Sequence, residues 1–128
     1  MKMYFDTYAI IEIINGNKNY EKFHSGVRVI TTKMNLLELY YSILKSGQKE
    51  RAEYYYERFL EFIVEIDDKT IKAASEFRLL NTKKKFSYID CLGYVLAMKT
   101  GVKFLTGDNA FKGMPNVEFV KWVILLLL

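Results

Sequence analysis

The sequence predicts a three-layer α/β/α sandwich with a mostly parallel, five-stranded sheet. Short apolar runs rich in β-branched and aromatic residues alternate along the chain with longer stretches of helical periodicity. Turn residues separate these segments, and neither a linker nor an internal repeat interrupts the 128 residues. Because strands that alternate with helices form parallel sheets covered on both faces, we expect one α/β domain spanning residues 1–128.

The first quarter of the chain predicts one strand followed by two helices. Residues 2–6 (KMYFD) have the composition of a strand, and the helical pattern over 7–14 ends at Asn15-Gly16. A second, shorter helix is expected over 19–25 (NYEKFHS). This order places the end of the first strand directly before a helix.

The middle of the chain predicts two strands with two helices between them. Residues 27–31 (VRVIT) are rich in β-branched side chains and predict a strand. A nearly all-apolar helix is expected over 32–45, and the next helix, over 49–62, is charged on one side and aromatic on the other. The run 63–66 (IVEI) predicts a brief strand.

The last part of the chain predicts two helices and the final two strands. Asp67-Asp68 can cap the first of these helices, because Asp is a preferred N-cap residue. The remaining elements are, in order, a helix over 69–80, a helix from Ser87 to about Gly101, a strand over 103–106, a short turn over 110–114 and a strand over 117–121.

An apolar extension, residues 121–128, follows the last predicted strand. Its WVILLLL run is far shorter than the ~20 residues that span a bilayer. The extension could lengthen the strand, cover the edge of the sheet or contact another subunit, and we expect packing within the chain. The N-terminus (MKMYFD) does not resemble a signal peptide, so we expect a soluble, cytoplasmic protein with no membrane partner.

The composition excludes several kinds of site. One cysteine, Cys91, rules out a disulfide within the chain and a cysteine-rich zinc site, and one histidine, His24, rules out a histidine-rich metal site. Oxygen ligands would have to hold any metal ion, and such ligands favour Mg²⁺ or Mn²⁺. The net charge of +4 and the pI near 9.0 allow an anionic partner without requiring one.

Four acidic residues lie in apolar runs, where an ionised carboxylate is costly. They are Asp6 after MYF, Glu38 in LLELYY, Asp90 in SYIDCLGYVLA and Asp108 after KFLTG. Asp6 and Asp108 come at or just past the carboxyl ends of predicted strands, the edge at which open parallel sheets bind ligands. We therefore expect the four carboxylates to converge there and to hold a divalent cation.

Each acidic residue also has a simple structural explanation. Asp6 could cap the helix that follows it, Ser87-x-x-Asp90 approximates a capping box, and Asp108 is an ordinary turn residue. Glu38 lies about two turns into its helix, beyond capping reach, so its alternative is a hydrogen bond to a buried Tyr or Lys. Four such coincidences together are less probable than any one of them.

A cluster of carboxylates around a divalent cation indicates phosphodiester chemistry. Neighbouring carboxylates raise one another's pKa unless a cation neutralises them. A bound divalent cation can activate water near neutral pH, and a second ion about 3.5–4 Å away can stabilise the leaving oxygen. Because the chain offers neither a Ser-His pair nor a nucleophilic Cys, metal-assisted hydrolysis is the simplest chemistry that these residues support.

The motifs and their order resemble the PIN-domain family, in particular the single-domain VapC-type toxins of toxin–antitoxin pairs. The resemblance runs from MYFDTYAI to NVEFVK, through the Glu-bearing NLLELYY, the Asp-bearing SYIDCLGYVLAMKTG and FLTGDNAF, which is similar to a Thr-x-Asp-x-x-Phe motif. Two features depart from the family pattern. Cys91-Leu92-Gly93 replaces the usual small residues after Asp90, so we expect helix packing there to differ, and the apolar extension is unusual.

The resemblance implies a Mg²⁺- or Mn²⁺-dependent endoribonuclease that cleaves RNA and is silenced by a cognate antitoxin protein. It implies metal ligation by Asp6, Glu38, Asp90 and Asp108. Thr7, Thr106 and Asn109 would orient these ligands or water. A homodimer is also implied by the resemblance.

Lysines near the acidic residues are candidate RNA contacts. Lys83-Lys84-Lys85 precedes the helix that carries Asp90, and Lys112 follows Asp108. Lysine side chains neutralise phosphates and make affinity salt-dependent, although a solvated basic loop explains the run of three equally simply. Tyr54-Tyr55-Tyr56, with Phe59 and Phe62, could present an apolar groove to a partner or pack in the core.

Two other functions compete with the ribonuclease. A catalytically inactive PIN-like module could bind RNA or a protein, but clustered negative charge facing a polyanion would gain it nothing. A phosphoryl-accepting receiver domain also gathers acids at strand ends. Receivers usually pair two adjacent acids early in the chain, whereas here the early site holds only Asp6.

Overall fold

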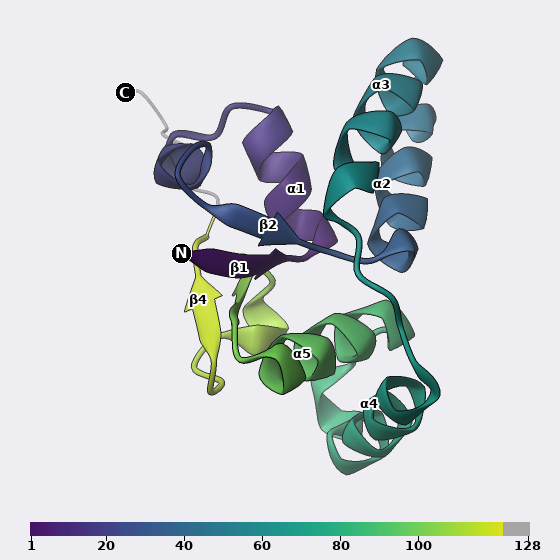
Figure 1. Ribbon diagram of the computed structural model, residues 1–128, viewed down its shortest axis with the longest axis vertical. Helices are drawn as coiled ribbons and strands as arrows, with labels where there is room; N and C mark the ends of the chain where they lie inside the picture. The colour runs from purple at the N-terminus through teal and green to yellow at the C-terminus, as the bar shows by residue number, and fades with distance from the viewer. Residues whose placement is uncertain (122–128) are drawn as a thin grey trace.

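The computed structural model describes residues 1–121, and the apolar run 122–128, with the packing expected for it, lies outside the described residues. Parallel strands form one sheet in the order β2-β1-β3-β4, with helices on both faces (Figure 1). The elements are β1 Lys2–Phe5, α1 Thr7–Ile14, η1 Lys18–Phe23, β2 Arg28–Ile30, α2 Lys33–Lys45, α3 Lys49–Phe59, η2 Leu60–Phe62, α4 Asp68–Leu80, η3 Thr82–Lys84, α5 Tyr88–Thr100, β3 Lys103–Thr106, η4 Asn109–Phe111 and β4 Val117–Phe119.

The predicted parallel α/β/α sandwich is confirmed, with four strands in the described part of the chain in place of five. The difference is the run 63–66, which forms only a single bridge, from Ile63 to Thr31. Thr31 exchanges two backbone hydrogen bonds there, accepting from Val64 N and donating to Phe62 O. The chain then leaves the sheet for α4, so the ladder does not extend into a strand.

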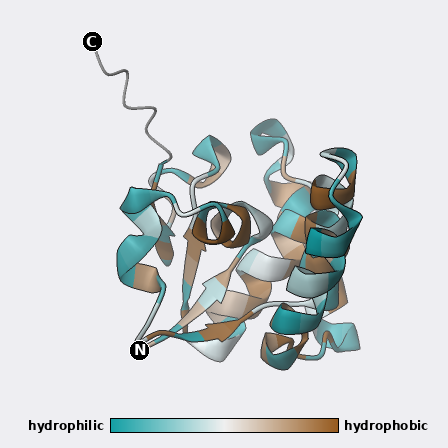
Figure 2. Ribbon diagram, turned by 90° about the horizontal axis from the view of Figure 1, so that it is seen from above, coloured by the Kyte–Doolittle hydropathy of each residue, from teal (hydrophilic) through white to brown (hydrophobic). Residues whose placement is uncertain are grey.

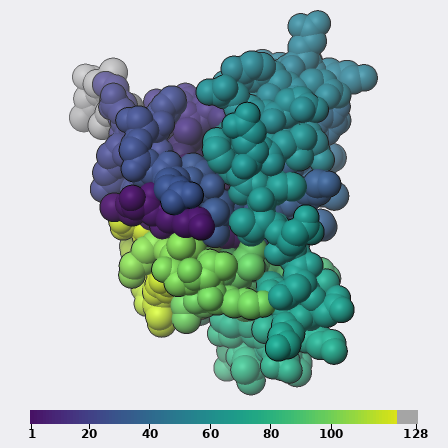
Figure 3. All heavy atoms as spheres, viewed as in Figure 1, coloured from purple at the N-terminus to yellow at the C-terminus, as the bar shows by residue number. Residues whose placement is uncertain are grey.

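The two faces of the sheet have separate apolar cores, which gives the three layers. Because side chains alternate along a strand, Met3 and Phe5 of β1 pack towards α1, α2 and α3, whereas Tyr4 faces α4 and α5. Figure 2 shows hydrophobic residues along the strands and hydrophilic ones on outward turns of the helices. In Figure 3, α3 projects at the top and α4 at the bottom, on opposite sides of the N-terminal strand.

The strand register brings the carboxyl ends of β1 and β3 together. Phe5 is paired with Leu105 at the end of these two central strands, so Asp6 and Thr106 follow side by side. The backbone N–H of Asp6 donates to the carbonyl of Leu105 at 3.3 Å. The chain then turns outward from both strands, and this edge of the sheet carries the candidate site.

In the Cys91-Leu92-Gly93 run, Gly93 allows close packing between α5 and β1. A Cβ atom at Gly93 would lie 2.8 Å from Cε1 and 2.9 Å from the hydroxyl oxygen of Tyr4. Glycine therefore lets the ring of Tyr4 lie directly against α5, buried beneath the sheet edge. No helix in residues 1–121 is long and apolar enough to cross a bilayer.

Candidate metal centre

Asp6 begins α1 and is also buried at the sheet edge. Its side chain caps the helix, because Oδ1 accepts a hydrogen bond of 2.8 Å from the backbone N–H of Ala9. Only 5% of the residue is exposed. The capping role proposed from the sequence is therefore correct, and it leaves the second carboxylate oxygen for another partner.

Asp90 and Asp108 also have capping roles. Ser87 and Asp90 form the expected capping box, in which Ser87 N donates to Asp90 Oδ2 at 2.9 Å and Asp90 N donates to Ser87 Oγ at 3.0 Å. Asp108 Oδ1 accepts from Ala110 N at 3.0 Å and begins η4. Each aspartate thus uses one oxygen for a cap, which fixes its side chain and leaves an oxygen uncommitted.

Glu38 is held by a side chain from another element and not by its own helix. Thr7 Oγ1, in the first turn of α1, donates to Glu38 Oε1 at 2.6 Å. The expected alternative, a hydrogen bond from a buried Tyr or Lys, is not what the described structure contains. Thr7 instead connects α1 to α2 immediately after Asp6, which links Glu38 to the end of β1.

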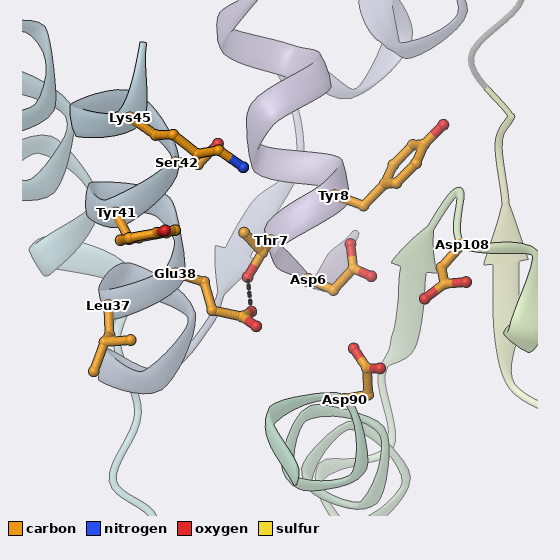
Figure 4. A pocket seen from close by; sticks show the side chains of 10 residues that line it. All are labelled: Asp6, Thr7, Tyr8, Leu37, Glu38, Tyr41, Ser42, Lys45, Asp90 and Asp108. Atoms are coloured by element: carbon orange, nitrogen blue, oxygen red, sulfur yellow. Dashed lines mark hydrogen bonds between the residues drawn. The ribbon is translucent and has the colours of Figure 1, made fainter. Parts of the chain in front are cut away.

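The four acidic residues line one cavity of about 430 Å³ (Figure 4). Glu38 points into it from α2, Asp90 from the start of α5, Asp108 from the end of β3 and Asp6 from between them. The convergence expected from strand ends is therefore present. The ten lining residues are Asp6, Thr7, Tyr8, Leu37, Glu38, Tyr41, Ser42, Lys45, Asp90 and Asp108.

Burial and mutual repulsion raise the pKa values of three of these carboxyl groups. Desolvation raises the pKa of Asp6 to about 8, with smaller contributions from the negative charges of Asp90 and Asp108. Desolvation is also the main cause that raises the pKa values of Glu38 and Asp90, with Asp90 repelling Glu38 and Asp108 repelling Asp90. The site is therefore one electrostatic unit that a cation would stabilise.

Thr106 interacts with both Asp6 and Asp108. Its buried hydroxyl lies near the Asp6 carboxylate and favours the ionised form, which opposes the rise in the pKa of Asp6. Thr106 Oγ1 also accepts from the backbone N–H of Asp108 at 3.1 Å. Asn109, by contrast, is exposed and does not line the cavity.

A buried relay behind Glu38 is a feature that the sequence analysis missed. The hydroxyls of Tyr4 and Thr32 both donate to Asn35 Oδ1, the latter at 2.7 Å. Asn35 Nδ2 then donates to Thr7 Oγ1 at 3.1 Å. Because the Thr7 oxygen accepts from Asn35, its single proton is directed to Glu38. The available signal was Asn35 itself, three residues before Glu38 and on the same helical face.

The oxygen donors around the cavity fit a hard divalent cation. Mg²⁺ prefers carboxylate oxygens and keeps several waters, so it needs only one or two direct protein ligands. Among the described residues, no three His, Cys, Asp or Glu side chains form a ready ligand group. Repulsion keeps uncompensated carboxylates apart, so ion binding requires them to move inward or to act through water.

The four lysines considered as RNA contacts lie outside the cavity. Lys83, Lys84 and Lys85 are exposed around η3, and Lys112 is exposed with its ammonium 5.8 Å from the centre of the Phe119 ring. The cation that lines the cavity is Lys45 at the end of α2. This residue was not singled out in the sequence because nothing local connects it to the acidic residues.

The PIN domain profile matches residues 3–117, nearly the whole described chain. The chain belongs to the PIN domain family. Among curated proteins, none matches it significantly. The match agrees with the resemblance noted in the sequence.

Solved structures of VapBC proteins share the fold of this PIN domain. One is the sarcin-ricin loop cleaving toxin VapC20 from Mycobacterium tuberculosis, with a TM-score of 0.75 and 16% identity over 92% of this chain and 98% of that one. Another is DNA-bound VapBC from Salmonella typhimurium, with a TM-score of 0.73 and 22% identity over 96% and 99%. VapBC2 from Rickettsia felis, bound to a promoter DNA fragment, gives 0.71 and 22% over 96% and 100%.

Proposed function

We propose that this PIN domain is a Mg²⁺- or Mn²⁺-dependent endoribonuclease and the toxin of a toxin–antitoxin pair. The observation that carries the proposal is the convergence of Asp6, Glu38, Asp90 and Asp108 around one cavity. Family membership and VapC-like neighbours support the nuclease and toxin assignments. RNA is the proposed substrate, and the cytoplasm is the proposed site of action.

In the proposed site, some residues would bind the metal ion and others position those ligands. Asp6, Glu38, Asp90 and Asp108 would supply oxygen ligands, and a bound divalent cation would lower the pKa of water and neutralise phosphate charge. Thr7 donates a hydrogen bond to Glu38 Oε1, and the Thr106 hydroxyl favours the ionised form of Asp6. The caps engage one carboxylate oxygen of each aspartate, and the other oxygen would bind the ion directly or through water.

An antitoxin is the proposed protein partner, and a homodimer the proposed assembly. The solved VapBC neighbours support an antitoxin because several are toxin–antitoxin complexes. An apolar groove of about 360 Å³ lies beside α3, lined in part by Phe5, Tyr54, Tyr55, Phe59 and Phe62. These include the aromatic residues singled out in the sequence, and such a groove suits an apolar segment of a partner.

The test is cleavage of a total RNA pool by purified, partner-free protein. Mn²⁺ or Mg²⁺ should produce cutting that both EDTA and Asp90→Asn abolish. Glu65→Gln, an exposed acid in the loop before α4, is the matched control and should cut as the wild type does. A folded preparation that neither cuts RNA nor binds Mn²⁺ would contradict the proposal and favour the inactive binding module.

A further inference from the structure

One wall of the acidic cavity is a single face of α2. Leu37, Glu38, Tyr41, Ser42 and Lys45 are five of the ten described residues that line it. Their spacing of three and four residues places them on one side of the helix. The wall therefore begins at the acidic centre and continues along α2, away from the four carboxylates.

Tyr41 is exposed on this wall and makes no specific contact. It is 64% exposed, and within residues 1–121 it forms neither a hydrogen bond nor a ring contact. The neighbouring Tyr40 differs, because its hydroxyl donates to Glu53 at 2.6 Å and its ring packs edge-on against Tyr56, 5.8 Å away. Folding therefore uses Tyr40, whereas the π-face of Tyr41 remains available to a ligand.

Lys45 is the only cation among the ten described residues that line the cavity. It is exposed, and it forms no hydrogen bond or ion pair with any of residues 1–121. In Figure 4 its side chain extends from α2 towards α1, above Ser42, with the ammonium group nearest the cavity. A single positive charge thus stands at the far end of an otherwise acidic cavity.

The spacing of these groups matches a strand of nucleic acid. Tyr41 is three residues, and Lys45 seven residues, beyond Glu38, or about 4.5 and 10 Å along the helix axis. Stacked nucleotides rise about 3.4 Å each, so Lys45 lies roughly three nucleotides from the acidic centre and Tyr41 roughly one. An unpaired base has an exposed π-face that a tyrosine ring can stack against.

From these observations we infer that the α2 wall is a subsite for single-stranded RNA flanking the cleaved bond. Tyr41 stacks on a base next to that bond, and Lys45 contacts a phosphate further along the strand. The inference rests on the proposed ribonuclease function and adds to it two residues that contact the substrate, Tyr41 and Lys45, and a direction along α2. Duplex RNA, whose bases are stacked and paired internally, would not offer Tyr41 a face.

A structural role for Lys45 is the competing explanation. A cation in the last turn of a helix interacts favourably with the helix dipole, and Lys45 occupies that turn. Such a role would alter unfolding of the protein and leave RNA binding unchanged. Stability and RNA affinity therefore have to be measured on the same variants.

The experiment measures binding of a fluorescent single-stranded RNA 12-mer of mixed sequence, in EDTA and at several salt concentrations. Tyr41→Leu should raise the Kd about 5- to 150-fold, while Tyr41→Phe should stay near the wild type because its ring still stacks. Lys45→Gln should weaken binding and reduce the slope of log K against log salt by about 0.7, the value for one phosphate on a single strand.

A matched control separates the subsite from general surface effects. Lys72→Gln removes another exposed lysine, on α4, and should bind RNA as the wild type does. Mn²⁺ affinity should be unchanged in every variant. The wild type cleaves RNA if the proposed function is correct. If Tyr41→Leu and Lys45→Gln then leave both the Kd and the salt slope unaltered, the subsite is overturned and the proposed function stands.

A wild type that folds but neither binds Mn²⁺ nor cleaves RNA would overturn the proposed function and the subsite with it. Equal binding of the 12-mer and of the same sequence annealed to its complement would overturn the assignment to single strands. The geometry predicts that the wild type binds the single strand more tightly than the duplex. Tyr41→Leu should lose this preference, and Tyr41→Phe should keep it.

Discussion

Replacing Asp6 by asparagine should stabilise the metal-free protein at neutral pH. Asp6 is buried, and desolvation raises its pKa from the ordinary 3.8 to about 8. The folded protein therefore retains a proton on Asp6 at pH values where the unfolded chain has lost it. The contribution of Asp6 to stability is therefore greatest below pH 4, falls as the pH rises towards 8 and then levels off.

The size of the effect follows from the two pKa values. One pKa unit corresponds to about 1.4 kcal/mol, so the interval from 3.8 to pH 7 corresponds to a cost of at most about 4 kcal/mol for Asp6. The asparagine side chain would resemble the protonated aspartic acid, because its amide oxygen can still accept from Ala9 N. Asp6→Asn should recover most of that cost at pH 7 and little of it at pH 4.

Urea unfolding in EDTA at pH 4, 5, 6, 7 and 8 measures this effect directly. The wild type should lose stability across the series, and Asp6→Asn should have a shallower slope, with the remainder due to Glu38 and Asp90, whose pKa values are also raised. Glu65→Gln is the control for removing an exposed carboxylate. Equal slopes for the wild type and Asp6→Asn would refute the argument that burial raises the Asp6 pKa.

Three further predictions concern Mn²⁺ binding, the hydrogen bond from Thr7 to Glu38 and the close packing at Gly107. Mn²⁺ at 100 times its Kd should stabilise the wild type by about 2.7 kcal/mol in thermal unfolding, and no change in Tm would count against a site in the folded state. Thr7→Val should weaken Mn²⁺ binding about 10- to 100-fold in titrations, because it removes the donor to Glu38, while Thr7→Ser should retain binding. Gly107→Ala should cost about 1–3 kcal/mol in urea unfolding, because its Cβ would lie 2.2 Å from Tyr8 Cε1 and 2.5 Å from the Val120 carbonyl oxygen. An unchanged unfolding midpoint would contradict that steric argument.

The local part of the site could be predicted because short-range rules determine it. Asp6 and Asp108 follow strands that end at one edge of a parallel sheet, so their proximity follows from topology. Ser87 and Asp90 form the capping box that their spacing indicates. The capping and convergence explanations proved compatible, since each aspartate has two oxygens and a cap occupies one of them.

The features that could not be predicted from the sequence depend on contacts between residues far apart in the chain. Asn35 looks like an ordinary polar residue in a helix until Tyr4, Thr32 and Thr7 are seen around it. Lys45 lines the acidic cavity only because the fold places α2 beside it. The run 63–66 has strand composition, but its pairing with a neighbouring strand is limited to one bridge, between Ile63 and Thr31, so composition alone overestimated the sheet by one strand.

Titration of the purified protein with Mn²⁺, followed by electron paramagnetic resonance, tests most directly whether the four converging carboxylates form a metal centre. We predict saturable binding to the wild type and to Glu65→Gln, with binding weakened at least about tenfold in Asp90→Asn and in Asp108→Asn. Folded wild-type protein that leaves all Mn²⁺ free in solution, or aspartate variants that bind it as tightly as the wild type, would contradict the metal centre.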